Sequence, residues 1–326
     1  MNDRVELQAS VPQELHGNRL DQAAAQLFPQ YSRSRLQEWI KKGALSMDGT
    51  QCRPRDKVVS GASLQINAEL ESEVSWQAED IALDMVYEDA AILVVDKPAG
   101  LVVHPAAGHA DGTLVNALLA HAPELAQLPR AGIVHRLDMD TSGILVVART
   151  LSAHHHLVGQ LQERSIKREY VAVCIGALTG GGRVDEPMGR HPRQRKKMAV
   201  LSAGGKTAIT HYRVAQRFGH HTRVTVNLET GRTHQIRVHM AHRRYPLIGD
   251  QMYGGRPRIP KGASDELIDT LRKFPRQALH ARSLGLIHPD SGDAVQFECP
   301  LPDDILNLIA VLEKEDPPLA SDTALY

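Results

Sequence analysis

The alternation of apolar and polar residues near the start of the chain predicts two short helices. Residues 18–28 carry apolar side chains at helical spacing, which places them on one face: Leu20, Ala24, Leu27 and Phe28. Pro29 ends this helix, and Ser32 is suited to cap a second helix, which ends at Gly43. Two amphipathic helices in succession indicate a compact N-terminal unit.

Short strands at residues 44–49 and 63–67 complete that unit. We predict a small α/β domain over residues 1–75, with a core of about residues 17–67. Residues 32–57 hold seven basic and three acidic side chains, which favours contact with the phosphates of a nucleic acid.

Beyond about residue 80 the pattern changes to short apolar runs, which are typical of strands. The clearest runs are residues 92–95, 132–137, 144–148, 170–175 and 222–228. Helical periodicity occurs at residues 114–122, 153–164 and 265–273. Because helices and strands do not alternate regularly, the pattern favours an α+β fold over a doubly wound parallel sheet.

Composition divides the rest of the chain. Residues 68–89 contain eight acidic side chains and no basic one, so we predict an acidic linker over residues 76–89. The strand-rich residues 90–312 form the predicted second domain. Residues 313–326 are expected to be a loosely held C-terminal tail.

Charge is unevenly distributed, although the 38 basic and 38 acidic residues balance. Residues 190–197 hold five basic side chains and no acidic one, and such local clusters attract polyanions. The cysteines, Cys52, Cys174 and Cys299, are far apart in the sequence, which argues against a disulfide framework or a zinc site. No apolar run approaches the length of a membrane span, so we expect a cytoplasmic protein without a membrane partner or a bound metal.

The most informative segment is residues 131–143, which contain His-Arg-Leu-Asp. We interpret residues 132–137 as a strand that delivers Asp138 into a polar turn closed by Gly143. A charged pair, Arg136 and Asp138, after an apolar run is costly unless it is used or paired. A protein-kinase catalytic loop is excluded, because the glycine-rich loop and the Asp-Phe-Gly motif are missing.

Three further motifs accompany this one along the chain, at residues 94–105, 167–176 and 229–254. They include Lys-Pro-Ala-Gly, a tyrosine after a basic pair, and Gly-Arg-Thr-His-Gln-Ile-Arg. Together the four motifs resemble those of the pseudouridine synthases, in particular the family typified by the large-subunit ribosomal RNA enzymes. The resemblance implies a mixed, largely antiparallel sheet split by a cleft, and a reaction without metal or nucleotide cofactor.

The resemblance also implies roles for individual residues. Asp138 corresponds to the catalytic carboxylate, Arg237 to the arginine that pairs with it, and Tyr170 to the tyrosine that stacks on the target uracil. The predicted substrate-binding residues are His135, Arg136, Arg232 and Ile236. Met139 departs from the family, which usually has lysine there, and this bears on substrate affinity rather than on the reaction.

The N-terminal unit resembles an S4-type RNA-binding domain. The residues predicted to bind RNA are Arg19, Ser32, Arg33, Arg35, Lys41 and Lys42. The expected partner is large-subunit ribosomal RNA or a pre-ribosomal particle, and the helix 69 stem-loop is the substrate that the resemblance implies. Two alternatives stay open: a related synthase that acts on other ribosomal or transfer RNA sites, and a non-catalytic S4-type RNA-binding or ribosome-assembly factor.

Overall fold

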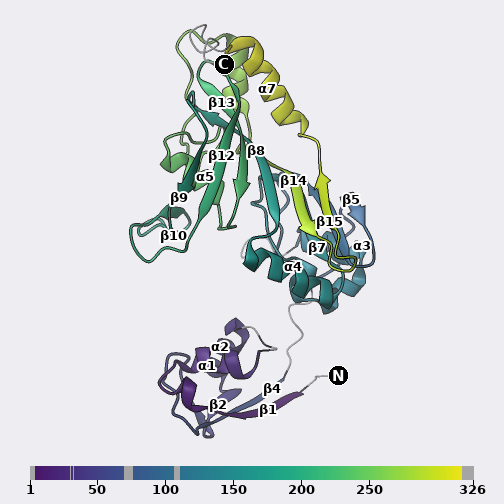
Figure 1. Ribbon diagram of the computed structural model, residues 1–326, viewed down its shortest axis with the longest axis vertical. Coiled ribbons are helices and arrows are strands. Elements are labelled where there is room, and N and C mark those ends of the chain that lie inside the picture. Colours follow the sequence, from purple (N-terminus) through teal and green to yellow (C-terminus); the bar gives the residue numbers. More distant parts are fainter. Residues whose placement is uncertain (1–3, 30, 32, 70–75, 106–110, 318–326) are drawn as a thin grey trace. The chain divides into compact units, whose positions relative to one another are not determined.

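The computed structural model describes residues 4–29, 31, 33–69, 76–105 and 111–317, and the chain divides into two compact units at residues 75 and 76 (Figure 1). In the N-terminal unit, helices α1 (Leu20–Leu27) and α2 (Arg33–Lys42) accompany a four-stranded antiparallel sheet. Its strands, in the order β1-β4-β2-β3, are β1 (Arg4–Ser10), β4 (Ser63–Glu69), β2 (Leu45–Met47) and β3 (Thr50–Gln51).

Helix periodicity explains how this unit folds. Leu36, Trp39 and Ile40 recur at the i, i+3, i+4 spacing of one helix face, and all three are buried with Leu20 of α1. The predicted N-cap, Ser32, lies outside the described residues. The unit therefore has its own apolar core.

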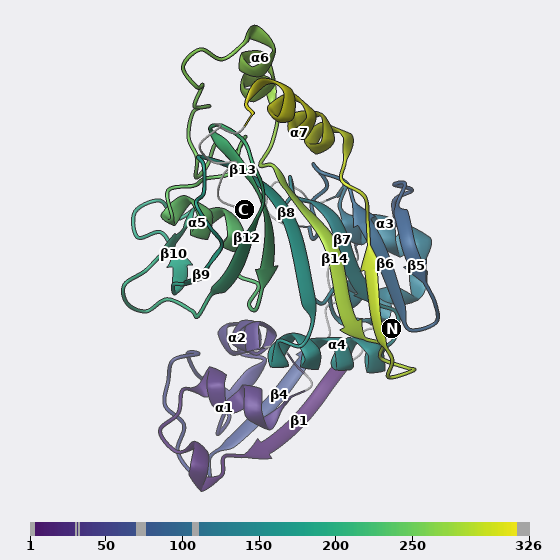
Figure 2. The same ribbon diagram turned by 45° about the horizontal axis from the view of Figure 1, so that its top comes forward.

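The second unit is built around a nine-stranded sheet (Figure 2). Along the sheet, the strand order is β5-β6-β7-β14-β8-β13-β12-β9, and β15 also pairs with β14. The bounds are β5 (Asp84–Glu88), β6 (Ile92–Lys97), β7 (Ser142–Ala148), β14 (Leu279–Ile287), β8 (Lys167–Ile175), β13 (His221–Leu228), β12 (Ile209–Arg217), β9 (Gly182–Asp185) and β15 (Ala294–Glu298). Among the strand pairs of the described chain, β7 with β14 is parallel and the others are antiparallel. The predicted α+β class with a largely antiparallel sheet is confirmed.

Five helices accompany this sheet in the described chain: α3 (Leu114–His121), α4 (Leu151–Glu163), α5 (Gln235–His242), α6 (Asp265–Lys273) and α7 (Asp303–Glu315). A short hairpin joins β10 (Met188–Arg190) to β11 (Met198–Val200). Every residue of β7 is buried, which explains why residues 144–148 form an unbroken apolar run rather than an alternation. None of the helices in the described residues is long and apolar enough to cross a membrane.

The structure corrects the expected strand at residues 132–137. Arg130, Ala131 and Gly132 all have left-handed backbone angles, with φ of 53°, 50° and 77°, and a strand cannot continue through them. Ile133 makes one isolated bridge to Val147, and the chain then runs as a loop to Asp138. Leu137 is buried because it packs in the core, not because it pairs in the sheet.

Two predicted boundaries are also wrong. The supposed linker, residues 76–89, contains edge strand β5, which pairs with β6 and tolerates acidic side chains because they face solvent. The predicted start of the C-terminal tail, residue 313, is too early in the sequence, because α7 continues to Glu315. The Asp316 side chain is buried and accepts hydrogen bonds from the amide of His220 and the ring of His221, so the chain is anchored to this point.

Candidate active site

Two glycines position the loop that carries Asp138. A Cβ atom at Gly132 would lie 2.0 Å from the carbonyl oxygen of Ala148, and one at Gly143 would lie 2.2 Å from that of Ala281. Both glycines have positive φ, 77° and 114°. The loop therefore starts and ends at close backbone contacts that only glycine permits.

Two cations hold the residues that follow Asp138. Lys97 at the end of β6 is fully buried, and its Nζ donates to the carbonyl oxygens of Met139 (2.9 Å), Pro98 (2.7 Å) and Leu101 (2.9 Å). Burial lowers the pKa of Lys97 to about 8. Arg276 donates to the carbonyl oxygen of Asp140 at 3.0 Å. These contacts fix the backbone on the C-terminal side of Asp138.

Asp138 is paired with an arginine from helix α5. Nη1 of Arg237 donates to Oδ2 of Asp138 at 3.0 Å, while Nε and Nη2 donate to the two carboxylate oxygens of Asp250 at 2.7 and 3.0 Å. The Asp250 side chain is fully buried and also accepts from the amides of Met252 and Tyr253. Because Asp250 fixes one side of the planar guanidinium, the other side points at Asp138.

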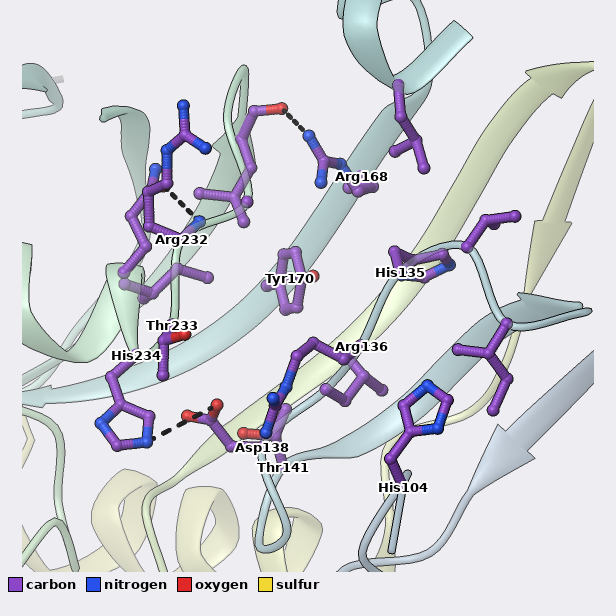
Figure 3. Close-up of a pocket in the computed structure, with 18 of the residues that line it drawn as sticks. His104, His135, Arg136, Asp138, Thr141, Arg168, Tyr170, Arg232, Thr233 and His234 are labelled. Atoms are coloured by element: carbon purple, nitrogen blue, oxygen red, sulfur yellow. Dashed lines mark hydrogen bonds and ion pairs between the residues drawn. The ribbon is translucent and has the colours of Figure 1, made fainter. Parts of the chain in front are cut away.

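His234 faces the second oxygen of Asp138, with Nε2 at 3.9 Å from Oδ1 (Figure 3). Its Nδ1 lies 2.7 Å from the hydroxyl of Tyr253, which accepts from the amide of Met198. Burial, with a contribution from Arg237, lowers the pKa of His234, although Asp138 acts in the opposite direction. With Nδ1 against the Tyr253 hydroxyl, the neutral ring turns Nε2 toward Asp138.

Asp138, His234 and Arg237 line one pocket of about 620 Å³. Tyr170 on β8 and Ile236 on α5 both line it and are largely buried, at 6% and 3% exposed. Burial raises the pKa of Tyr170, so its phenol is neutral, and its ring faces the pocket beside Asp138 and Arg136 (Figure 3). A ring next to a carboxylate in a partly apolar pocket suits a planar base.

The four residues predicted to bind substrate all line this pocket, with different surroundings. Arg136 is exposed and forms no hydrogen bond or ion pair with the described residues, so it is not a structural partner of Asp138 or Asp140. Nε2 of His135 accepts from the amide of Val146, and burial lowers its pKa to about 3; this ring positions the loop and is neutral. Arg232 donates to the carbonyl oxygen of Thr207.

Sequence reasoning found the central pair but missed the residues that orient it. Asp250, Tyr253 and Lys97 lie within the recognised motifs, yet nothing in their spacing indicates that they act on Asp138 or its loop. His234 lies within the Gly-Arg-Thr-His-Gln-Ile-Arg motif but was not among the predicted site residues, and its ring contacts the hydroxyl of Tyr253. His239 contacts Thr210 and the backbone of Glu186.

In the N-terminal unit, a buried carboxylate forms ion pairs with two of the predicted RNA-binding arginines. Asp21 pairs with Nε of Arg19 at 3.0 Å and with Nη2 of Arg33 at 2.7 Å. Burial alone would raise the pKa of Asp21, but these bonds lower it to about 2. Lys42 pairs with Glu38 on the helix surface at 3.0 Å. Part of the basic cluster is thus already engaged within the protein.

A second pocket opens beside this ion pair. It is lined by Arg19, Gln37, Lys41, Arg53, Pro54 and Arg55. Arg53 and Arg55 were not among the predicted RNA-binding residues, because they follow a strand rather than lie on the basic helix. Four cationic side chains around one hollow provide a site for an anion such as phosphate.

The fold and part of the sequence match known RNA-modifying proteins. Residues 91–242 match the RNA pseudouridylate synthase family, a segment that contains Asp138, Tyr170 and Arg237. The human protein named RNA pseudouridylate synthase domain containing 4 shares the fold, with a TM-score of 0.56 at 23% identity over 72% of this chain and 95% of that protein.

Closer relatives cover almost the whole chain. A Pseudomonas aeruginosa protein named ribosomal large subunit pseudouridine synthase D is 61% identical over 315 residues, which are 97% of this chain and 98% of the relative. A protein of the same name from Escherichia coli strain K12 is 54% identical over 316 residues, 97% of each chain. The chain belongs to the RNA pseudouridine synthase family and is an isomerase, which confirms the predicted enzyme class.

Proposed function

We propose that this chain converts uridine to pseudouridine in large-subunit ribosomal RNA, with Asp138 as the catalytic carboxylate. The single observation that carries the proposal is the Asp138–Arg237 ion pair, which lies in the same pocket as Tyr170. The names of the Pseudomonas and Escherichia relatives support the RNA class. Within that RNA, the motif resemblance supports the helix 69 stem-loop, free or in a pre-ribosomal particle in the cytoplasm.

The proposed reaction balances within one nucleoside. The N1–C1′ bond breaks and a C5–C1′ bond forms, while C5 loses a proton and N1 gains one. No electrons are transferred, so the step needs no redox or nucleotide cofactor. Attack on the base, attack on the sugar and removal of a ribose proton all require an ionised carboxylate, and the Arg237 guanidinium donates a hydrogen bond to one oxygen of that group.

The remaining pocket residues have roles that follow from their surroundings. Tyr170 offers a neutral ring on which the extruded uracil stacks, an interaction worth ~1–3 kcal/mol per base. Arg136 is exposed and has no hydrogen-bond or ion-pair partner among the described residues, so its planar guanidinium can fill the gap that the extruded nucleotide leaves in the RNA stack. Ile236 supplies an apolar wall.

The N-terminal unit is proposed to bind RNA backbone through its basic pocket. Lys41 and Arg19, with Arg53 and Arg55, would contact phosphates, and Asp21 fixes the aim of Arg19. Arg33, Arg35 and Lys42 lie on α2, the helix that also carries Lys41. Such contacts add affinity without reading sequence.

The test compares the wild-type chain with Asp138→Asn. Asparagine is nearly isosteric, so it removes the charge and leaves no cavity. We expect tritium release from RNA labelled at uracil C5 to be abolished, while RNA affinity and thermal stability stay close to wild type. Substantial turnover by the asparagine variant would remove Asp138 from the catalytic role.

The substrate is identified by mapping pseudouridines with carbodiimide-dependent reverse-transcription stops. RNA from cells with and without the chain is compared, and purified protein is tested with chelator present. We expect signals in the helix 69 loop. Signals only in transfer RNA, or at another large-subunit site, would assign a different substrate to the same active site.

A further inference from the structure

One end of the active-site pocket is aromatic and is not used by the proposed chemistry. Trp76 and His104 line the same pocket as Asp138, with ring centroids 6.1 Å apart and planes tilted by 52°. In Figure 3, His104 and His234 lie at opposite ends of the site, and Arg136 and Asp138 lie between them. The aromatic end is therefore separate from the Asp138–His234 contact.

Hydrogen bonds attach the backbone beside both aromatic residues to the start of helix α3. The buried Asn116 side chain donates to the carbonyl oxygen of Gln77 at 2.7 Å, which anchors the residue after Trp76. On the other side, the amides of Leu114 and Val115 donate to the carbonyl oxygens of residues 102 and 103, which precede His104. One helix terminus thus holds the backbone next to both rings.

The surroundings of the rings suit a nucleotide. Burial, together with Arg130 and Arg136, lowers the pKa of His104 to about 4, so its ring is neutral at physiological pH. Arg130 also lines the pocket, is exposed, and forms no side-chain hydrogen bond or ion pair within the described part of the chain. Its φ of 53° is a strained value for a residue other than glycine, and such strain is concentrated at functional sites.

We propose that Trp76 and His104 form a second base-binding subsite, which holds the base of a nucleotide adjacent to the target uridine, with Arg130 beside its phosphate. The inference rests on the proposed RNA substrate. Aromatic rings and cations in one groove are the combination that binds single-stranded nucleic acid. A uridine extruded to Asp138 brings its neighbour close to the same pocket, which Trp76 and His104 also line.

The first experiment follows Trp76 directly. The chain has two tryptophans, and Trp39 is a buried core residue of the N-terminal unit, so Trp39→Phe leaves Trp76 as the only tryptophan. In an Asp138→Asn background, the shortest stem-loop RNA that the wild-type chain modifies is titrated. Stacking should quench Trp76 fluorescence with the same midpoint as RNA binding, which is measured separately by anisotropy of labelled RNA. Bound RNA with unchanged fluorescence would overturn the proposal.

The second experiment separates stacking from a structural role. Trp76→Leu keeps an apolar side chain against the core and removes the ring. We expect KM to rise about 5- to 150-fold, as for the loss of one stacked base, with kcat unchanged. Tyr87→Leu, which removes an exposed aromatic outside the pocket, is the matched control and should behave as wild type.

RNAs that are abasic at the position before or after the target complete the test. At one of the two positions, the abasic RNA should raise KM for the wild-type chain but cause no further rise for Trp76→Leu, because both changes remove the same contact. If the rises in KM caused by the abasic site and by Trp76→Leu were additive at both positions, the subsite would be refuted. A fall in kcat with KM unchanged would refute it as well. RNA that is neither bound nor modified would refute the proposed function itself, whereas normal modification without any effect of Trp76 refutes only the subsite.

Discussion

Replacing Arg237 by lysine tests whether the geometry of the guanidinium, and not its charge alone, serves Asp138. Arg237 uses three nitrogens at once: two for Asp250 and one for Asp138. A lysine ammonium has one nitrogen and cannot occupy three separate positions. We expect it to remain with the fully buried Asp250 and to lose the bond to Asp138.

The magnitude follows from the number of bonds lost. A hydrogen bond to a charged group is worth about 1.5–3 kcal/mol. Losing the Asp138 bond in the transition state would therefore lower kcat about 10- to 150-fold. Losing one of the two bonds to Asp250 would reduce the free energy of unfolding by a similar ~1.5–3 kcal/mol.

The assay measures tritium release and chemical denaturation of the same preparations. Arg149→Lys is the matched control, because Arg149 also bonds two carboxylates, those of Glu88 and Glu124, but lies outside the pocket. It should lose some stability and retain normal kcat. If Arg237→Lys turned over at the wild-type rate, the orientation of Asp138 by the planar guanidinium would be refuted.

Three further outcomes are expected. Gly132→Ala should unfold at markedly lower denaturant concentration than wild type, because its Cβ would lie 2.0 Å from the Ala148 carbonyl oxygen; equal midpoints would contradict the close contact. The pKa of Asp21 is lowered to about 2, so its contribution to stability is present above pH 4 and is lost as pH falls from about 4 to about 2; Asp21→Asn should remove this loss in urea unfolding followed by fluorescence. Deleting residues 1–75 should leave a folded second unit that binds RNA with a shallower salt dependence, and an unchanged slope in filter binding would exclude phosphate contacts by the N-terminal unit.

Much of the local structure was predictable because periodic burial leaves a periodic sequence. The helix predicted over residues 265–273 begins and ends at the observed residues, and the apolar runs at 92–95 and 144–148 lie in the buried strands β6 and β7. The apolar run at residues 132–137 was wrongly predicted to be a strand for the same reason. Burial alone does not distinguish a strand from a loop packed in the core, and the left-handed angles before it leave little trace beyond one glycine.

The sequence by itself determined the family and named the central residues, because the four motifs keep their residue types and order. It could not determine what orients them. Arg237 is 99 positions from Asp138, and Lys97 is 42 positions from the Met139 carbonyl that it holds. Hydrogen bonds of this kind form only where the sheet brings β6, the Asp138 loop and α5 together. No local sequence pattern predicts that these segments lie close in space. Tertiary structure alone decided that Asp250 aims Arg237, that His234 faces Asp138, and that Trp76 lines the same pocket.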